Sequence, residues 1–206
     1  VDPPKADAAS SLKALADAKR LAEMLPDDYQ AAVLLGSILA DQGQLAEAEQ
    51  TFLRVKELGT KSGDPALAAR GCLALALFLA TKSRDEGRAE QEYEGCLASY
   101  PTEPLALQLA TQFYDATKRS ERGTALWQHA VDEAPKNLSF RMMLAERMAA
   151  TGKGDEAQTL LKQSAESFGT PGAWQVLSDF QRRHGHPEDA ARSLERTSMR
   201  VATQGV

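Results

Sequence analysis

Apolar residues recur along this chain at helical spacing, and the whole pattern repeats every 34 residues. Ala14 and Ala48 stand one such step apart, and the bulky residues Tyr93, Trp127 and Leu161 keep the same step. Residues that end helices follow the step as well: Pro26 and Thr60, and further on Pro101, Pro135 and Gly169. A small residue, a bulky residue and a helix stop at constant offsets predict a stacked array of helical hairpins.

Proline and glycine mark where the helices begin and end. Prolines that suit the first turn of a helix are Pro65, Pro104 and Pro171. Glycines that suit a left-handed helix end, each five residues before an alanine, are Gly43, Gly152 and Gly185. The sequence therefore predicts an all-α chain of about eleven helices in a single array over residues 1–206. Its expected parts are a leading helix over 7–25 and five hairpins over 29–60, 65–101, 104–135, 138–169 and 171–201.

The second hairpin departs from the period, because Ala48 and Ala89 stand 41 residues apart, seven more than elsewhere. We expect the additional residues in loops, since a helix of fixed phase does not absorb them. Two stretches qualify, 61–64 before Pro65 and 81–87 between the two helices. Such an insertion is either a tolerated change of loop length or the mark of a functional face.

The repeating unit resembles the tetratricopeptide repeat (TPR) family, whose 34-residue unit carries small residues where two helices cross and bulky residues beside them. Four stretches match in phase, and the matches in the first and third are Leu35, Gly36, Leu39, Ala48 and Phe52, then Leu107, Tyr114, Trp127, Ala130 and Pro135. The fourth and fifth match at Leu144, Ala145, Met148, Ala157 and Leu161, then at Trp174, Leu177, Ser178, Ala190 and Leu194. The resemblance implies a right-handed superhelical solenoid of antiparallel hairpins. It also implies a non-enzymatic scaffold that binds other proteins.

Composition narrows the classes of partner. The formal net charge is −5, whereas nucleic-acid binding needs a basic footprint, so we expect no nucleic-acid partner. The longest apolar run, residues 72–80, is too short for a membrane span, and we expect no direct membrane insertion. No secretory signal is visible, but the chain begins at Val1 and is either a processed form or a piece of a longer protein. Cytoplasmic and periplasmic locations therefore both stay open.

Cys72 and Cys96 are the two cysteines of the chain. We expect two small buried apolar residues, because free cysteine is often buried. The alternative is a disulfide between the paired helices of one repeat, which would imply an oxidising compartment.

We find no pattern of residues that indicates catalysis, a metal or a cofactor. His184 and His186 lie in the turn of the last hairpin, but a metal site needs three or four converging ligands. The acid-rich helix over 86–94 has the pattern of a solvated outer face. We therefore expect a protein that is not an enzyme and that holds no metal or cofactor.

The TPR resemblance implies a concave groove lined by the first helix of each hairpin. Carried over position by position, its expected residues are Gln30, Val33, Ser37 and Ala40, then Leu105, Gln108, Gln112 and Asp115, then Met142 and Glu146, and finally Gln175, Asp179 and Arg182. Phe78 joins them as a possible apolar pocket, unless the inserted loop covers it. The expected floor of the groove is rich in amide side chains and nearly uncharged. The lysine and asparagine clamp of chaperone-binding relatives is absent, with Val33 and Ser37 in its place.

Two functions follow from these expectations. The first is an adaptor that holds a peptide or helix of a protein partner in the groove. The second is a structural segment of a larger assembly, such as an envelope or export system, that self-associates or contacts partners through its ends. Leu194, Met199 and Val201 of the last helix would then be partly exposed.

Overall fold

The structure is a computed structural model that describes the backbone of residues 8–204 and the side chains of residues 10–196. Within these limits it contains eleven α-helices, one π-helical turn and no strand, which confirms the all-α prediction. Met199 and Val201 lie outside the described side chains. The chain divides into two compact units, Val1–Phe113 and Tyr114–Val206, and each is described by itself.

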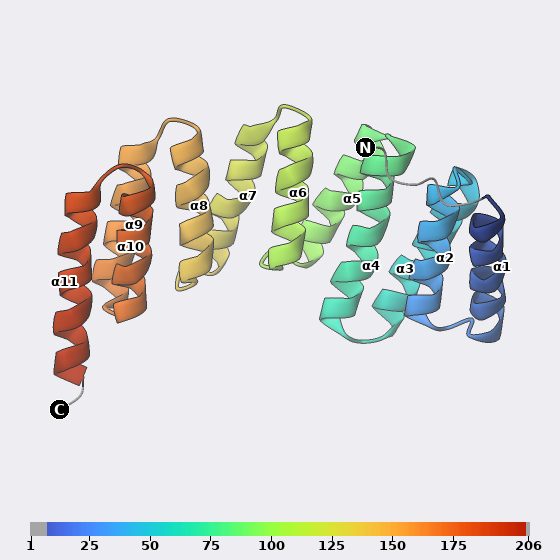
Figure 1. Ribbon diagram of the computed structural model, residues 1–206, viewed down its shortest axis with the longest axis horizontal. Coiled ribbons are helices and arrows are strands. Elements are labelled where there is room, and N and C mark those ends of the chain that lie inside the picture. The colour runs from blue at the N-terminus through green and yellow to red at the C-terminus, as the bar shows by residue number, and fades with distance from the viewer. Residues whose placement is uncertain (1–7, 205–206) are drawn as a thin grey trace. The chain divides into compact units, whose positions relative to one another are not determined.

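Unit 1 is a series of antiparallel helices, as Figure 1 shows. Its elements are α1 (Ala8–Met24), α2 (Tyr29–Asp41), α3 (Leu45–Lys61), α4 (Pro65–Phe78), the π-helical turn η1 (Leu79–Ser83), α5 (Glu86–Ser99) and most of α6 (Pro104–Ala116). Unit 2 begins at the end of α6. Its further helices are α7 (Ser120–Glu133), α8 (Leu138–Ala150), α9 (Gly154–Phe168), α10 (Pro171–Arg183) and α11 (Pro187–Gln204).

The helix starts are set by short polar side chains. The carboxylate of Asp28 accepts a hydrogen bond from the Ala31 amide at 2.7 Å, and Asp64 caps α4 in the same manner. Asn137 caps α8 and Thr170 caps α10. Each cap satisfies amide groups that have no partner inside the helix, so the first helix of a hairpin begins at a defined residue.

The turn inside each hairpin places one residue in the left-handed region, five residues before the small residue that recurs in the second helix. Glycine occupies it in three hairpins, with φ of 75°, 83° and 85° at Gly43, Gly152 and Gly185. Arg84 and Lys118 occupy it in the other two, with φ of 56° and 60°. All five hairpins thus place a left-handed residue at the same offset, although only glycine adopts this conformation without steric cost.

The residues that carry the 34-residue period form the core. Ala48, Ala89 and Ala157 are fully buried, and the bulky residues four positions later, Tyr93 among them at 1% exposure, fill the space beside them. Burial raises the pKa of the Tyr93 phenol to about 12. The small residues let the helices approach and the bulky ones pack the gaps, which is the packing that the period predicts.

The expectation that the second hairpin carries its additional residues in loops is wrong. Its turns are short, and the residues instead lengthen the helices: α3 continues to Lys61, and α4 continues directly into η1. The Leu79 carbonyl accepts from the amides of Arg84 and Asp85, which closes a wider turn than an α-helix has. A π-helical turn lets a helix take up residues and still return to its packing face.

The helix formed by α4 and η1, Pro65–Ser83, is long and apolar enough to cross a membrane by length and composition alone. Half of its most apolar stretch is buried inside unit 1. Leu73, Leu75 and Ala76 are each at most 2% exposed. The apolar composition of this helix is therefore accounted for by packing on both sides, between α3 and α5.

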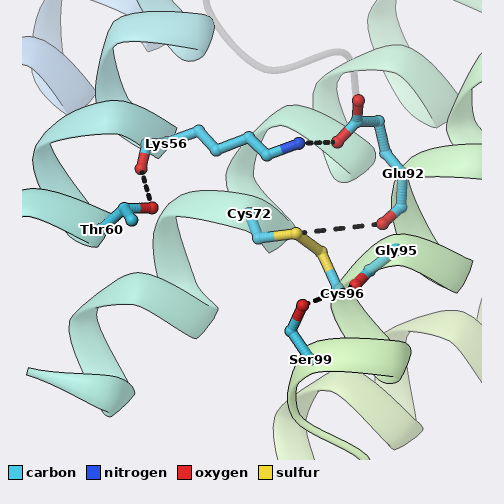
Figure 2. The surroundings of a disulfide bond; sticks show 7 residues. All are labelled: Lys56, Thr60, Cys72, Glu92, Gly95, Cys96 and Ser99. Carbon is cyan, nitrogen blue, oxygen red and sulfur yellow. Dashed lines mark hydrogen bonds and ion pairs between the residues drawn. A yellow bond between two sulfur atoms is a disulfide. The ribbon is translucent and has the colours of Figure 1, made fainter.

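Two features fix α4 against its neighbours. On one side, a Cβ at Gly71 would stand 2.8 Å from the Val55 carbonyl oxygen, and one at Gly59 would stand 2.7 Å from the Leu67 carbonyl oxygen. On the other side, Cys72 and Cys96 form a disulfide between α4 and α5 (Figure 2). The expectation of two free cysteines is therefore wrong, and the alternative is the one the structure contains. Cysteines are often buried whether they are free or in a disulfide, so composition did not distinguish the two alternatives.

Candidate partner-binding surface

The first helices of unit 1 each present a stripe of exposed residues. On α2 the stripe contains Gln30, Leu34, Ser37 and Asp41, and on α4 it contains Arg70 and Leu77. On α6 it contains Leu105, Gln108 and Gln112. We call these residues the unit 1 surface. It combines large apolar side chains with amides that can donate and accept, a mixture suited to an apolar segment of a protein partner.

Three leucines supply the apolar part of the unit 1 surface. Leu34 is 46% exposed, Leu77 is 40% exposed and Leu105 is 39% exposed. The sequence analysis placed Leu105 on this face but did not include Leu34 and Leu77. The signal that could have found Leu34 was its helical spacing from Gln30 and Ser37. Leu77 could not be placed on this face, because the additional residues of the second hairpin were expected in loops and not in the helix.

Phe78 does not belong to this surface. Its side chain is 3% exposed and its ring lies 5.1 Å from the ring of Phe52, centroid to centroid. Ala40, which the resemblance also placed in the groove, is 7% exposed. Both residues face the core because the phase of each helix turns them toward the second helices. Val33 is half-buried, so only part of its side chain is exposed on this surface.

An ion pair closes one end of the unit 1 surface. The Lys82 ammonium lies 2.6 Å from the Asp41 carboxylate, which joins the end of α2 to η1. Both side chains are largely exposed, so the pair contributes little to stability, roughly 0–1 kcal/mol. It links the end of α2 to η1, which continues α4.

In unit 2 the charged residues expected in the groove are engaged in ion pairs. Glu146 binds two residues at the end of α10: the Arg183 guanidinium at 2.7 Å and the His184 ring nitrogen at 3.1 Å. Asp179 binds Arg182 at 2.8 Å and accepts from the Gln175 amide at 3.2 Å.

The expectation of a nearly uncharged floor therefore fails in unit 2, where charges are present and paired. Met142 is half-buried.

Asp115 and Arg147 form an ion pair with two hydrogen bonds. Both guanidinium nitrogens of Arg147 donate to the carboxylate, at 2.5 and 2.7 Å, and one also donates to the Ser120 carbonyl at 2.9 Å. The Arg147 hydrogen bonds hold the pKa of Asp115 below its ordinary value. Asp115 therefore stays ionised and joins the end of α6 to α8, where it serves packing more than binding.

We find no cluster of side chains suited to a metal ion within the part of the chain that the structure describes. No three histidine, cysteine, aspartate or glutamate side chains there come close enough to hold a metal ion. His184 packs on Phe180, with ring centroids 4.3 Å apart, and contacts Glu146. It is part of a packed ion-pair cluster.

Comparisons with known proteins give only distant neighbours. The chain matches no protein-family model and no curated protein sequence. Among solved structures it is similar to MamA from Desulfovibrio magneticus RS-1, with 22% identity, a TM-score of 0.47, and coverage of 76% of this chain and 85% of that one.

Two further neighbours have comparable values. A putative kinesin light chain of Podospora anserina with TPR-like repeats has 20% identity, a TM-score of 0.48, and coverage of 87% and 97%. YrrB, a TPR protein with an unusual peptide-binding site, has 14% identity, a TM-score of 0.44, and coverage of 92% and 98%.

The assignment of the fold depends on the chain itself. Five hairpins place a left-handed residue at the same offset, and the small and bulky residues of the period lie in the core at equivalent places. With its eleven described helices, this chain has the fold of a TPR-like array of antiparallel helical hairpins.

Proposed function

We propose that the protein is a non-enzymatic scaffold and that the unit 1 surface binds an apolar peptide or helix of a protein partner. The observation that carries this proposal is the set of exposed leucines, Leu34, Leu77 and Leu105, on three successive first helices. Large apolar side chains exposed on a rigid surface, with amides between them, are typical of protein-binding sites. Because the helices are already formed, little entropy is lost on the scaffold side.

The test uses a double variant with a matched control. Leu34→Asp with Leu77→Asp puts two charges on the unit 1 surface, and we expect capture of partners from source-cell lysate to fall at least tenfold. The control, Leu45→Asp with Leu53→Asp, changes two leucines of similar exposure, 38% and 43%, on the second helix α3. A partner lost by both variants, or by neither, would contradict binding at the unit 1 surface.

A second candidate is end-to-end association of two copies through α1, and one observation favours it. Ala14 is exposed, whereas its equivalents in the period, Ala48, Ala89 and Ala157, are fully buried. Leu12 and Met24 on the same helix are 65% and 68% exposed. The small residue that elsewhere receives a neighbouring helix is thus exposed on α1.

Light scattering over a range of concentrations tests this candidate. We expect a concentration-dependent dimer that Leu12→Asp with Met24→Asp converts to a monomer, because two charges in an apolar contact cost several kcal/mol to bury. The Leu45→Asp with Leu53→Asp protein is again the control and is expected to keep the dimer. A parent protein that is monomeric at all concentrations would refute self-association.

A further inference from the structure

A second candidate site lies in unit 2, among helices α9, α10 and α11. These helices line a solvent-open cavity of about 150 Å³ that contains none of the residues expected for the groove. Its lining residues are Gln158, Lys162, Trp174, Leu177, Gln181, Asp189, Arg192, Ser193 and Arg196. Eight of these nine residues carry a polar side-chain atom, and Leu177 is the exception. The cavity is therefore suited to a polar ligand group and does not resemble an empty gap in the core.

The charges around the cavity are predominantly positive. Lys162, Arg192 and Arg196 line it together with a single acid, Asp189, although the whole chain carries a net charge of −5. Asp189 is already bound, since its carboxylate accepts from Arg192 and lies 3.5 Å from the Gln158 amide nitrogen. Lys162 and Arg196 supply the remaining positive charge. The cavity thus attracts an anion.

Trp174 also lines the cavity. Its side chain is 3% exposed. The guanidinium of Arg196 lies 4.9 Å above the centre of its ring, which places a cation against one face of the indole. Trp174 therefore helps to hold the Arg196 charge at the cavity.

The polar network of the last hairpin fixes the opposite wall. Ser193 donates to the Gln181 side-chain oxygen at 2.8 Å, and Ser178 donates to the Ala190 carbonyl at 2.9 Å. Both contacts are buried and join α10 to α11. Because these bonds hold the two helices in register, the cationic side chains of α11 project from a rigid frame. Such a frame is a condition for selective binding.

We propose that this cavity binds a carboxylate, namely the side chain of a glutamate or aspartate on a protein partner. Arginine and lysine with a planar acceptor form strong charge-assisted hydrogen bonds, and the internal Asp189–Arg192 pair already shows a carboxylate bound there. A volume of about 150 Å³ is smaller than the roughly 300–1,000 Å³ of small-molecule pockets, and it suits a single side chain. The site is independent of the unit 1 surface.

Nuclear magnetic resonance of the indole N–H groups tests the proposal directly, because the chain has only two tryptophans. The Trp127→Phe variant assigns the two signals. We expect acetyl-Glu-Glu-Glu-amide to shift the Trp174 signal in a saturable manner and acetyl-Gln-Gln-Gln-amide to leave it in place. An equal shift with the glutamine peptide, or no shift with either, would overturn the proposal.

Charge variants show whether the cavity itself binds the peptide. Lys162→Gln with Arg196→Gln should weaken binding at least tenfold, since it removes two charge-assisted hydrogen bonds to the carboxylate. Asp189→Asn should tighten binding severalfold, because it removes the competing carboxylate and releases Arg192. Lys136→Gln with Arg182→Gln removes the same two charges from unit 2, outside the cavity, and should have less than a twofold effect.

Three results would reject the site. The first is a control double variant that weakens binding as much as the cavity variant, which would mean attraction to the general charge of the protein. The second is an Asp189→Asn protein that binds more weakly than the parent. The third is inorganic phosphate that binds more tightly than the glutamate peptide, because the ligand would then be another kind of anion.

Discussion

Replacing Gly71 with alanine is expected to lower the free energy of unfolding by about 1–3 kcal/mol, the range found when atoms are added to a tightly packed core. The new methyl group would stand 2.8 Å from the Val55 carbonyl oxygen and 3.1 Å from the Lys56 Cα. Both are backbone atoms and cannot rotate away. The helices α3 and α4 would have to separate, and the buried side chains between them would lose contacts. Urea unfolding followed by circular dichroism at 222 nm measures the loss.

The direction of this effect distinguishes packing from helix propensity. Alanine is favoured over glycine inside a helix by about 1 kcal/mol, so a glycine without close neighbours should gain from the same change. Gly95 in α5 is such a site, since a Cβ there meets nothing within 4 Å. We expect Gly95→Ala to raise stability by up to about 1 kcal/mol. A Gly71→Ala protein as stable as the parent would show that α3 and α4 do not approach closely.

The periodic residues made most of the fold predictable. Small residues such as Ala48 and bulky ones such as Tyr93 are determined by the distance between neighbouring helices, and that requirement repeats with every hairpin. The π-helical turn η1 could not be predicted, because counting residues gives the length of an insertion and not its conformation. No glycine indicated the left-handed residues of the second and third hairpins, because Arg84 and Lys118 occupy those positions.

The candidate site was predictable only in part, for a related reason. A position in the 34-residue period places a residue on one face of its helix. This was enough to expect Gln30, Ser37 and Gln108 on an exposed face. It does not say which side chains on other helices come near. The pair between Glu146 and Arg183 joins residues of separate hairpins, and its formation depends on the packing of α8 against α10. Pairings of this kind require the three-dimensional arrangement.

Removing the disulfide is the second change with a large expected effect. Cys72 and Cys96 are 24 residues apart, and closing a loop of that length restricts the unfolded chain by about 3–4 kcal/mol in the chain-entropy account. We expect Cys72→Ala with Cys96→Ala to lower the free energy of unfolding by about this amount. Alanine is the suitable replacement because Cys96 is fully buried, and serine would add a polar group to the core. Urea unfolding of the parent and variant proteins measures the difference.

A reducing agent separates the effect of the bond from that of the lost sulfur atoms. In unfolding experiments equilibrated with reductant, the parent protein should lose a similar amount of stability, whereas the double alanine variant should not respond. Equilibration is needed because both cysteines are at least nine-tenths buried and the folded protein shields the bond from attack. A parent protein whose stability is the same with and without reductant would mean that the bond does not form. The close packing of α4 on α3 through Gly71 would then be left as the main restraint on that helix.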